Sequence, residues 1–238
     1  MSIFRKESSE KLVLLFGQSG SGKSTICAVM SLFFHELEGV VPEIGAVSNP
    51  EGARLLRTWV RELRVGKFPK RTDAGTFTSI TVGFRKIGSH EGLRFVLLEI
   101  AGEDVIVLDP LHVSHLARPE LLDEWVESAS AIVLVASTQA FADDRYILLG
   151  FCEYLHERGL IKPLCLVISE WDRVSSSGQT VLEYARENYG EVTRYVADAA
   201  GELLAFSVGT VDLSSNRIDS VDFSSGTMAL VEWLMNTP

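Results

Sequence analysis

Eight residues near the N-terminus constrain this chain more than any other feature. At positions 17–24 they read Gly-Gln-Ser-Gly-Ser-Gly-Lys-Ser, which satisfies the pattern G-x-x-x-x-G-K-[ST]. An apolar run at 12–16 precedes them and a helical pattern at 23–37 follows, so the pattern stands between an expected strand and an expected helix. Glycines there let successive backbone N–H groups point at phosphate oxygens, and the helix N-terminus adds its dipole. The segment predicts a loop that binds the phosphates of a nucleoside triphosphate.

Every residue of this loop, and the threonine after it, is a candidate nucleotide-binding residue. Lys23 would bridge the β- and γ-phosphates as a point charge, and the Ser24 hydroxyl would bind Mg²⁺. The simpler alternative is a Gly/Ser turn with an exposed lysine. The nucleotide-binding set is Gly17, Gln18, Ser19, Gly20, Ser21, Gly22, Lys23, Ser24 and Thr25.

Strand and helix patterns alternate along the rest of the chain. Apolar or β-branched runs predict strands at 12–16, 76–87, 93–100, 131–137, 164–169 and 203–208. Helical periodicity predicts helices at 23–37, 50–65, 119–128, 141–158, 181–199 and 227–235. This alternation predicts an α/β fold with three layers, a mostly parallel sheet and helices on both faces. We expect a single domain over 1–238, with a helical insertion at about 42–66.

Charge and cysteine usage narrow the function classes. The formal net charge of −10 opposes binding to nucleic acid phosphates or anionic lipid. Cys27, Cys152 and Cys165 are odd in number and lie in apolar stretches, which favours buried thiols over disulfides or a zinc site. The apolar runs are too short to span a bilayer. We expect a cytoplasmic protein without a nucleic-acid partner or a membrane span.

The segment Leu-Glu-Ile-Ala-Gly-Glu at 98–103 resembles the D-x-A-G-Q/E element of translation-factor-like and Ras-like GTPases. The resemblance implies that Glu99, in place of the usual aspartate, contacts Mg²⁺ through water. It also implies that the Gly102 N–H senses the γ-phosphate. Glu103 stands where a water-positioning glutamine is frequent, and its repulsion from the γ-phosphate predicts slow intrinsic hydrolysis. The alternative is a turn with two solvated glutamates.

Two further segments bear on the base of the nucleotide. Ser169 and Asp172 fall where GTPases carry [NT]-K-x-D, and an aspartate there pairs with guanine hydrogens that adenine lacks. Glu170 replaces the lysine that normally packs over the base, which weakens the case for guanine. Ser207 and Val208 follow the last expected strand, at the place of an S-A-K-like loop whose backbone N–H faces the guanine oxygen. Together the resemblance implies guanine in preference to adenine.

The threonine that would complete the Mg²⁺ site has more than one candidate. Phe-Pro-x-x-Thr at 68–72 resembles the bacterial double-GTPase families and favours Thr72, whereas the spacing to Glu99 favours Thr76 or Thr78. If Thr72 is the ligand, Lys70 and Arg71 would neutralise γ-phosphate charge as a built-in arginine finger does. The alternative for this basic pair is a solvated loop.

The order of these motifs over 12–234 resembles the double-GTPase group of bacterial GTPases found with prokaryotic conflict systems. The resemblance implies a Mg²⁺-dependent switch that hydrolyses GTP to GDP and acts on a protein partner, either a second GTPase-like domain or an effector. Its implied catalytic residues are Lys23, Glu103 and Thr72, and its implied Mg²⁺ ligands are Ser24, Thr72 and Glu99.

The switch reading makes the segment 105–119, with His112 and His115, the expected output surface. Two rivals stay open. One is an ATPase or kinase with the P-loop pattern that uses an adenine nucleotide. The other is a nucleotide-binding scaffold that does not hydrolyse its ligand.

Overall fold

The computed structural model describes residues 9–44, 50–70, 77–88, 92–100, 119–139, 141–224 and 226–237. Strands and helices alternate along most of this length. In chain order the elements are β1 (Ser9–Phe16), α1 (Lys23–Glu36), β2 (Val40–Ile44), α2 (Pro50–Arg64), β3 (Phe77–Lys86), β4 (Gly92–Ile100), α4 (Pro119–Ser128), β5 (Ala131–Ser137), α5 (Phe141–Glu157), β6 (Leu164–Ser169), the 3₁₀ helices η2 (Trp171–Arg173) and η3 (Ser175–Ser177), α6 (Val181–Asp198), β7 (Glu202–Ala205), β8 (Gly209–Asp212), β9 (Arg217–Val221) and α7 (Thr227–Asn236).

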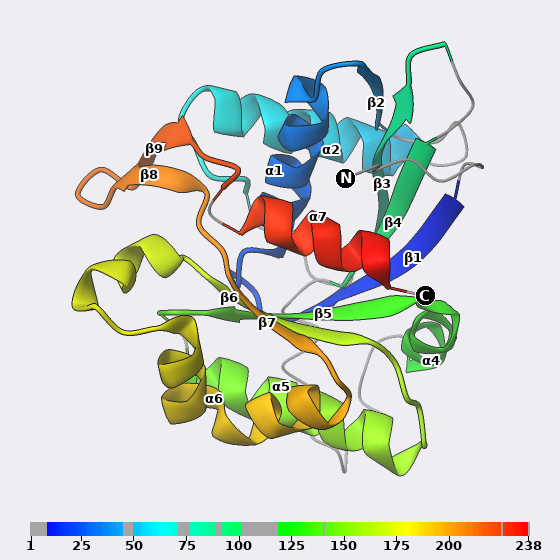
Figure 1. Ribbon diagram of the computed structural model, residues 1–238, viewed down its shortest axis with the longest axis vertical. Helices are drawn as coiled ribbons and strands as arrows, with labels where there is room; N and C mark the ends of the chain where they lie inside the picture. The colour runs from blue at the N-terminus through cyan, green and yellow to red at the C-terminus, as the bar shows by residue number, and fades with distance from the viewer. Residues whose placement is uncertain are drawn as a thin grey trace.

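Seven strands form one sheet in the order β2-β3-β4-β1-β5-β6-β7. The strands β4, β1, β5, β6 and β7 run parallel, while β3 pairs antiparallel with both β2 and β4. From β1 the chain builds one half of the sheet, ending at β4, and then builds the other half from β5 (Figure 1). The strand order therefore reverses at β1, and ligands of open α/β sheets bind at the carboxyl end of such a strand.

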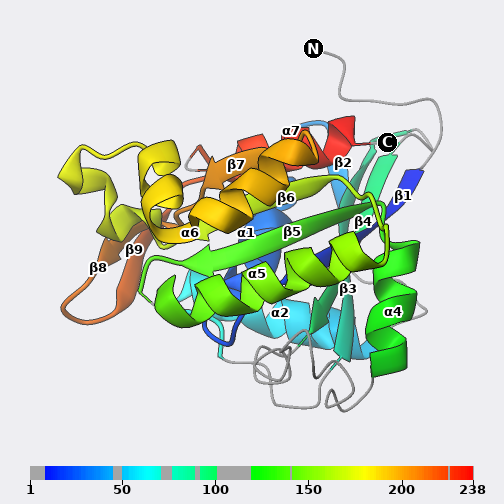
Figure 2. The ribbon, with the colours of Figure 1, turned by 90° about the horizontal axis from the view of Figure 1, so that it is seen from below.

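The sheet separates two apolar cores. Alternate residues of β1 face opposite sides, with Val13 and Leu15 in the core under α1, α2 and α7. Leu14 and Phe16 lie in the other core, under α4, α5 and α6, where the ring of Phe16 stacks on Phe151 at 3.7 Å between centroids. Figure 2 shows α5 and α6 in front of the sheet. The expected α/β class with a mostly parallel sheet is confirmed, with helices on both faces.

Four strands differ from expectation. β2 and the hairpin β8–β9 were not expected from sequence, because each strand is four or five residues long and none carries a continuous apolar run. The expected strand at 203–208 ends at Ala205, because the carbonyl oxygen of the next residue accepts a hydrogen bond from the Trp171 N–H in the turn after β6. Of the region expected as a helical insertion, 42–66, the first residues belong to β2 and the helix is α2.

All three cysteines lie buried and none of them forms a disulfide bond, as expected. Within the described parts of the chain, the helices are each too short or too polar to cross a bilayer.

Candidate functional site

The residues after β1 form a tight loop closed by their own lysine. Lys23 Nζ donates hydrogen bonds to the carbonyl oxygens of Gly17 at 2.6 Å and Gln18 at 2.9 Å, and the side chain is only 4% exposed. The Ser21 N–H donates to Gln18 O at 3.1 Å. Gly22 has a φ of 97°, in the left-handed region that a side chain strains. The backbone of residues 17–22 therefore curls into a closed loop at the N-terminus of α1, which we call the ring.

Neighbouring strands brace this ring closely. A Cβ added to Gly17 would lie 2.2 Å from the carbonyl oxygen of Val135 in β5. On the other side, the Ser169 hydroxyl at the end of β6 donates to Ser21 O at 2.6 Å. The side-chain oxygen of Ser21 is itself buried and finds no hydrogen-bond partner among the described residues. The ring leaves no room for a side chain at its base and has a polar atom that a ligand could satisfy.

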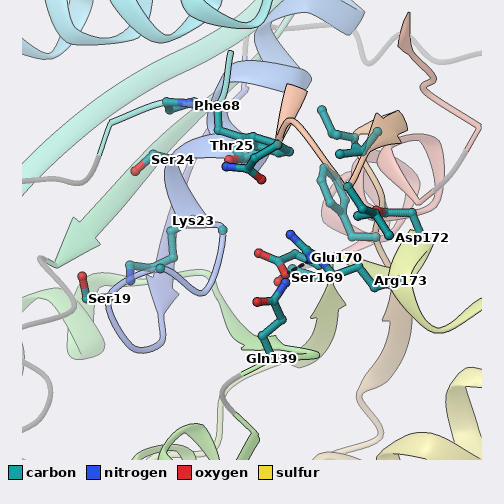
Figure 3. Close-up of a pocket in the computed structure, with 18 of the residues that line it drawn as sticks. Ser19, Lys23, Ser24, Thr25, Phe68, Gln139, Ser169, Glu170, Asp172 and Arg173 are labelled. Carbon is teal, nitrogen blue, oxygen red and sulfur yellow. Dashed lines mark ion pairs between the residues drawn. The ribbon is translucent and has the colours of Figure 1, made fainter. Parts of the chain in front are cut away.

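A cleft of about 560 Å³ opens beside the ring, at the carboxyl edge of the parallel strands (Figure 3). Its volume lies in the range of sites that bind small molecules and cofactors. The walls come from the ring and the start of α1, from the residues after α2, from the ends of β5 and β6, and from the loop and hairpin after β7. They comprise Ser19, Gly20, Gly22, Lys23, Ser24, Thr25, Phe68, Pro69, Lys70, Gln139, Ser169, Glu170, Asp172, Arg173, Phe206, Val208, Val211, Leu213 and Asn216.

The cleft brings together three of the segments that the sequence singled out. Ser24 and Thr25 line it at the ring, while Ser169, Asp172 and Val208 line it at the far end. Ser207 is buried, with 8% of its surface exposed, and lies close enough to the carboxyl group of Asp172 to lower its pKa. Segments far apart in the sequence thus meet in one place because parallel strands end at the same edge.

The other expected site residues lie partly or wholly outside the described chain. Glu99 has a described backbone only, which stands opposite Leu15 of β1, one residue before the end of that strand. Thr72, Thr76, Gly102 and Glu103 lie outside the described residues, as do Arg71, His112 and His115. The backbone of Thr78, in β3, pairs with that of Glu99, in β4. The side chain of Thr78 is not among the described ones.

The far wall of the cleft is held by backbone bonds between distant segments. The Trp171 N–H donates to Phe206 O at 3.1 Å, and the Phe206 N–H donates to Ile168 O at 2.9 Å. The indole of Trp171 meets the ring of Tyr184 edge-on at 5.6 Å. These contacts fix the turn after β6 against the loop after β7, so Asp172 keeps its position beside Ser207.

Two carboxyl groups give this wall its electrostatic character. Burial raises the pKa of Glu170 above its usual value, and the guanidinium of Arg173 opposes the shift. Burial also raises the pKa of Asp172, against the lowering effect of Arg173 and of the hydrogen bond from Ser207. Arg173 Nε lies 3.0 Å from Glu170 Oε2.

The cleft therefore has two unlike ends. The ring presents a helix N-terminus and the ammonium of Lys23, which attract anions. The opposite end presents the carboxyl groups of Glu170 and Asp172, which repel phosphate and accept hydrogen bonds. A ligand with phosphates at one end and hydrogen-bond donors at the other matches this polarity.

Several wall residues were not expected from sequence. Gln139 lies two residues after the end of β5, so the rule that ligands gather at the carboxyl ends of parallel strands would have found it. Arg173 follows Asp172 and carries no signal of its own. Val211, Leu213 and Asn216 belong to the hairpin, whose tip turns on hydrogen bonds from serine side chains and has no periodicity to read.

No protein-family model matches this chain, and no curated protein is significantly similar to it in sequence. The assignment of a function therefore depends on the geometry and charge of the cleft.

Proposed function

We propose that this chain is a Mg²⁺-dependent guanine-nucleotide-binding protein with the P-loop NTPase fold, a switch that hydrolyses GTP to GDP. The single observation that carries the proposal is the cleft with unlike ends, the ring 17–22 with Lys23 at one end and Asp172 beside Ser207 at the other. The position of the ring at the strand-order reversal supports the fold assignment.

The ring fits a phosphate chain. Its close approach to Val135 O at Gly17 keeps the backbone curled, and the buried oxygen of Ser21 lacks a partner among described groups. Lys23 already lies across the ring, where its ammonium would meet the phosphates with little loss of side-chain freedom.

Mg²⁺ would neutralise charge that builds up on the phosphates during hydrolysis. Ser24 lines the cleft next to Lys23 and would hold the ion, with Thr72 and Glu99 as the further ligands. A hydroxyl and a carboxylate are oxygen ligands of the kind that Mg²⁺ prefers.

The carboxyl end of the cleft fits guanine better than adenine. Asp172 offers acceptor oxygens, and its carboxyl group lies beside the buried Ser207. Guanine presents two adjacent N–H donors on its pairing edge, whereas adenine presents an acceptor at the matching ring position and would leave the buried carboxylate unpaired.

Turnover belongs to the same proposal. We assign the attacking water to Glu103 and Thr72, with Lys23 stabilising charge on the phosphates. Repulsion between the carboxylate of Glu103 and the γ-phosphate makes intrinsic hydrolysis slow, so a protein partner in the cytoplasm would set the rate and receive the signal. That partner is a second GTPase-like domain or an effector.

The test is calorimetric titration with Mg²⁺ and GDP, GTP, ADP or ATP, on the parent and on Asp172→Ala. We expect guanine nucleotides to bind at least tenfold more tightly, about 1.4 kcal/mol, and the preference to vanish in the variant. Asp198→Ala is the control, because that exposed residue ends α6 outside the cleft lining. Equal binding of all four nucleotides would remove the role assigned to Asp172.

One observation favours a second candidate. Glu170 stands where a guanine site usually has a lysine, and its carboxyl group lines the cleft. An ATPase or kinase, or a scaffold without turnover, would tolerate that change. A preference for ADP and ATP would support the ATPase or kinase. Tight GTP binding without release of phosphate, measured with and without candidate partners, would support the scaffold.

A further inference from the structure

The carboxyl end of the cleft contains a residue that neither the loop pattern nor the base-reading motif accounts for. Arg173 is the last residue of η2 and lines the cleft, with 28% of its side chain exposed. Figure 3 shows its side chain turned toward Glu170, on the wall between Asp172 and Gln139. Its ion pair joins Nε to Glu170 Oε2 at 3.0 Å, so it uses the inner nitrogen of the guanidinium.

Glu170 is in turn held in place from several sides. Its backbone has a φ of 57°, the left-handed conformation that a non-glycine residue adopts only under constraint from its surroundings. The Thr138 hydroxyl donates to Glu170 O at 3.2 Å, and the side chain of Gln139 lies near enough to the Glu170 carboxyl group to lower its pKa. The arginine is therefore paired with a carboxylate that is itself fixed, which lowers the entropy that Arg173 would lose on binding a ligand.

A purine in this part of the cleft needs a surface for its face as well as a partner for its edge. Asp172 can read the edge, but the lysine stem expected at position 170 is absent. A guanidinium is planar, weakly hydrated and stacks on aromatic rings, and it is the cationic group that best replaces such a stem.

We infer that Arg173, held by Glu170, is the residue that packs against the face of the nucleotide base. The inference rests on the proposed function only in placing the base at the carboxyl end of the cleft. Every base has a π-face, so stacking on Arg173 adds affinity without selecting between bases. Asp172 would select guanine over adenine, and Arg173 would increase the affinity for either base.

This division of labour gives a test with three probes, each with Mg²⁺: GDP, ADP and inorganic tripolyphosphate, titrated calorimetrically. In Arg173→Ala we expect the affinities for GDP and ADP to fall by a similar factor, roughly 5- to 30-fold. Binding of tripolyphosphate, which has no base, stays within about twofold of the parent. Arg186→Ala is the control, because Arg186 is exposed on α6 and is not among the residues that line the cleft.

Two further variants separate stacking from charge. Arg173→Lys keeps the positive charge but not the plane, so we expect it to lose nearly as much base affinity as Arg173→Ala. Glu170→Gln loosens the arginine, and we expect a smaller loss that disappears when Arg173→Ala is already present. Melting curves of the nucleotide-free variants check that each is folded.

Three outcomes would overturn the inference. The first is parent-like affinity of Arg173→Ala for GDP. The second is an equal loss of affinity for tripolyphosphate and GDP, which would mean that Arg173 binds phosphate. The third is a loss of affinity for GDP but not for ADP, which would mean that Arg173 contacts the hydrogen-bonding edge of the base. The proposed function fails differently. A parent that prefers ADP removes the guanine assignment and leaves the Arg173 comparison intact, and a parent that binds none of the three probes removes both.

Discussion

Gly17 directly follows β1, and the carbonyl oxygen of Val135 lies only 2.2 Å from the place that a Cβ would occupy. The side-chain oxygen of Ser21 lies 2.9 Å from the same point. Backbone on one side and the ring on the other leave nothing that can move cheaply. At the scale of the residue, the shape of the loop therefore depends on glycine at position 17, because glycine alone has no Cβ.

Gly17→Ala should distort the ring and overpack it. We expect a loss of about 1–3 kcal/mol in the free energy of unfolding and more than a tenfold loss of GDP affinity. The matched control is Gly190→Ala in α6, where an added Cβ meets nothing within 4 Å. That change should leave GDP binding intact and raise helix stability by about 0.5–1 kcal/mol. Urea unfolding and calorimetry measure both, and parent-like GDP binding by Gly17→Ala would contradict the ring geometry.

The raised pKa of the Asp172 carboxyl group lets us predict how GDP affinity depends on pH. Burial raises the pKa of its carboxyl group, so on acidification the folded protein takes up this proton at a higher pH than the unfolded chain does. For the nucleotide-free protein the group's contribution to stability therefore rises as pH falls through the raised pKa. Guanine needs the charged form, so GDP affinity should fall over the same interval, above the ordinary carboxyl value of about 3.9.

Titrations with GDP at decreasing pH measure this effect, and tripolyphosphate serves as the control for titration of the phosphates themselves. In Asp172→Asn the additional loss seen with GDP should vanish. A GDP-to-tripolyphosphate ratio that stays constant down to the ordinary carboxyl range would speak against the assigned role of Asp172.

At the scale of the element, a buried lysine joins the two ends of the described chain. Lys11 in β1 is 6% exposed, and its Nζ donates to Leu234 O at 3.0 Å, to Met235 O at 3.2 Å and to Thr237 O. The last carbonyl groups of a helix have no partners within it and favour a cation. Lys11 therefore satisfies the end of α7 and holds that helix against the sheet.

Lys11→Met should lower the free energy of unfolding by about 1.5–3 kcal/mol, because buried carbonyl groups lose a charged donor. Lys162→Met is the comparison. Lys162 caps α4 in the same way, through Glu127 O at 2.7 Å and Ala129 O at 2.9 Å, but it is only partly buried, so water can replace it. We expect a loss under about 1 kcal/mol there. Equal urea midpoints for the two variants would show that burial of Lys11 adds nothing.

At the scale of the whole molecule, one sheet with a core on each face supports the cleft. Cys27 and Cys165 lie in the core under α1, and Cys152 lies in the core under α5. Burial raises the pKa of the Cys152 thiol to about 12 and raises that of Cys165 as well. The thiols of Cys152 and Cys165 are therefore buried and protonated in the folded protein. The rate at which a reagent modifies them reports how often the two cores open.

We expect a thiol reagent to label all three cysteines slowly in the native protein and rapidly in urea. GDP with Mg²⁺ at about 100 times its Kd should add about 2.7 kcal/mol to stability and slow labelling by about 100-fold, if opening is global. Gly17→Ala should show no such protection. Labelling of any one cysteine at the rate of a free thiol would contradict its burial.

Much of the fold was predictable because it depends on short-range pattern. The expected helices at 119–128 and 141–158 and the strands at 131–137 and 164–169 match the structure to within a residue. Continuous apolar runs and helical spacing are properties of ten or twenty neighbouring residues, and each buried element must satisfy them locally. The position of the glycine-rich loop is equally local in the sequence, since its pattern is made of residues that follow one another.

By itself, then, the sequence determined the α/β alternation and where the candidate phosphate loop lies. Only the tertiary structure decided the strand order, the hairpin that walls the cleft, the Ser169 hydrogen bond to the ring and the Glu170–Arg173 pair. Glu170 and Arg173 are close in sequence, but nothing local shows that both face the cleft. Those features arise where segments distant in sequence come into contact. The free energy of such long-range contacts depends on the whole packed structure and not on any short stretch of sequence.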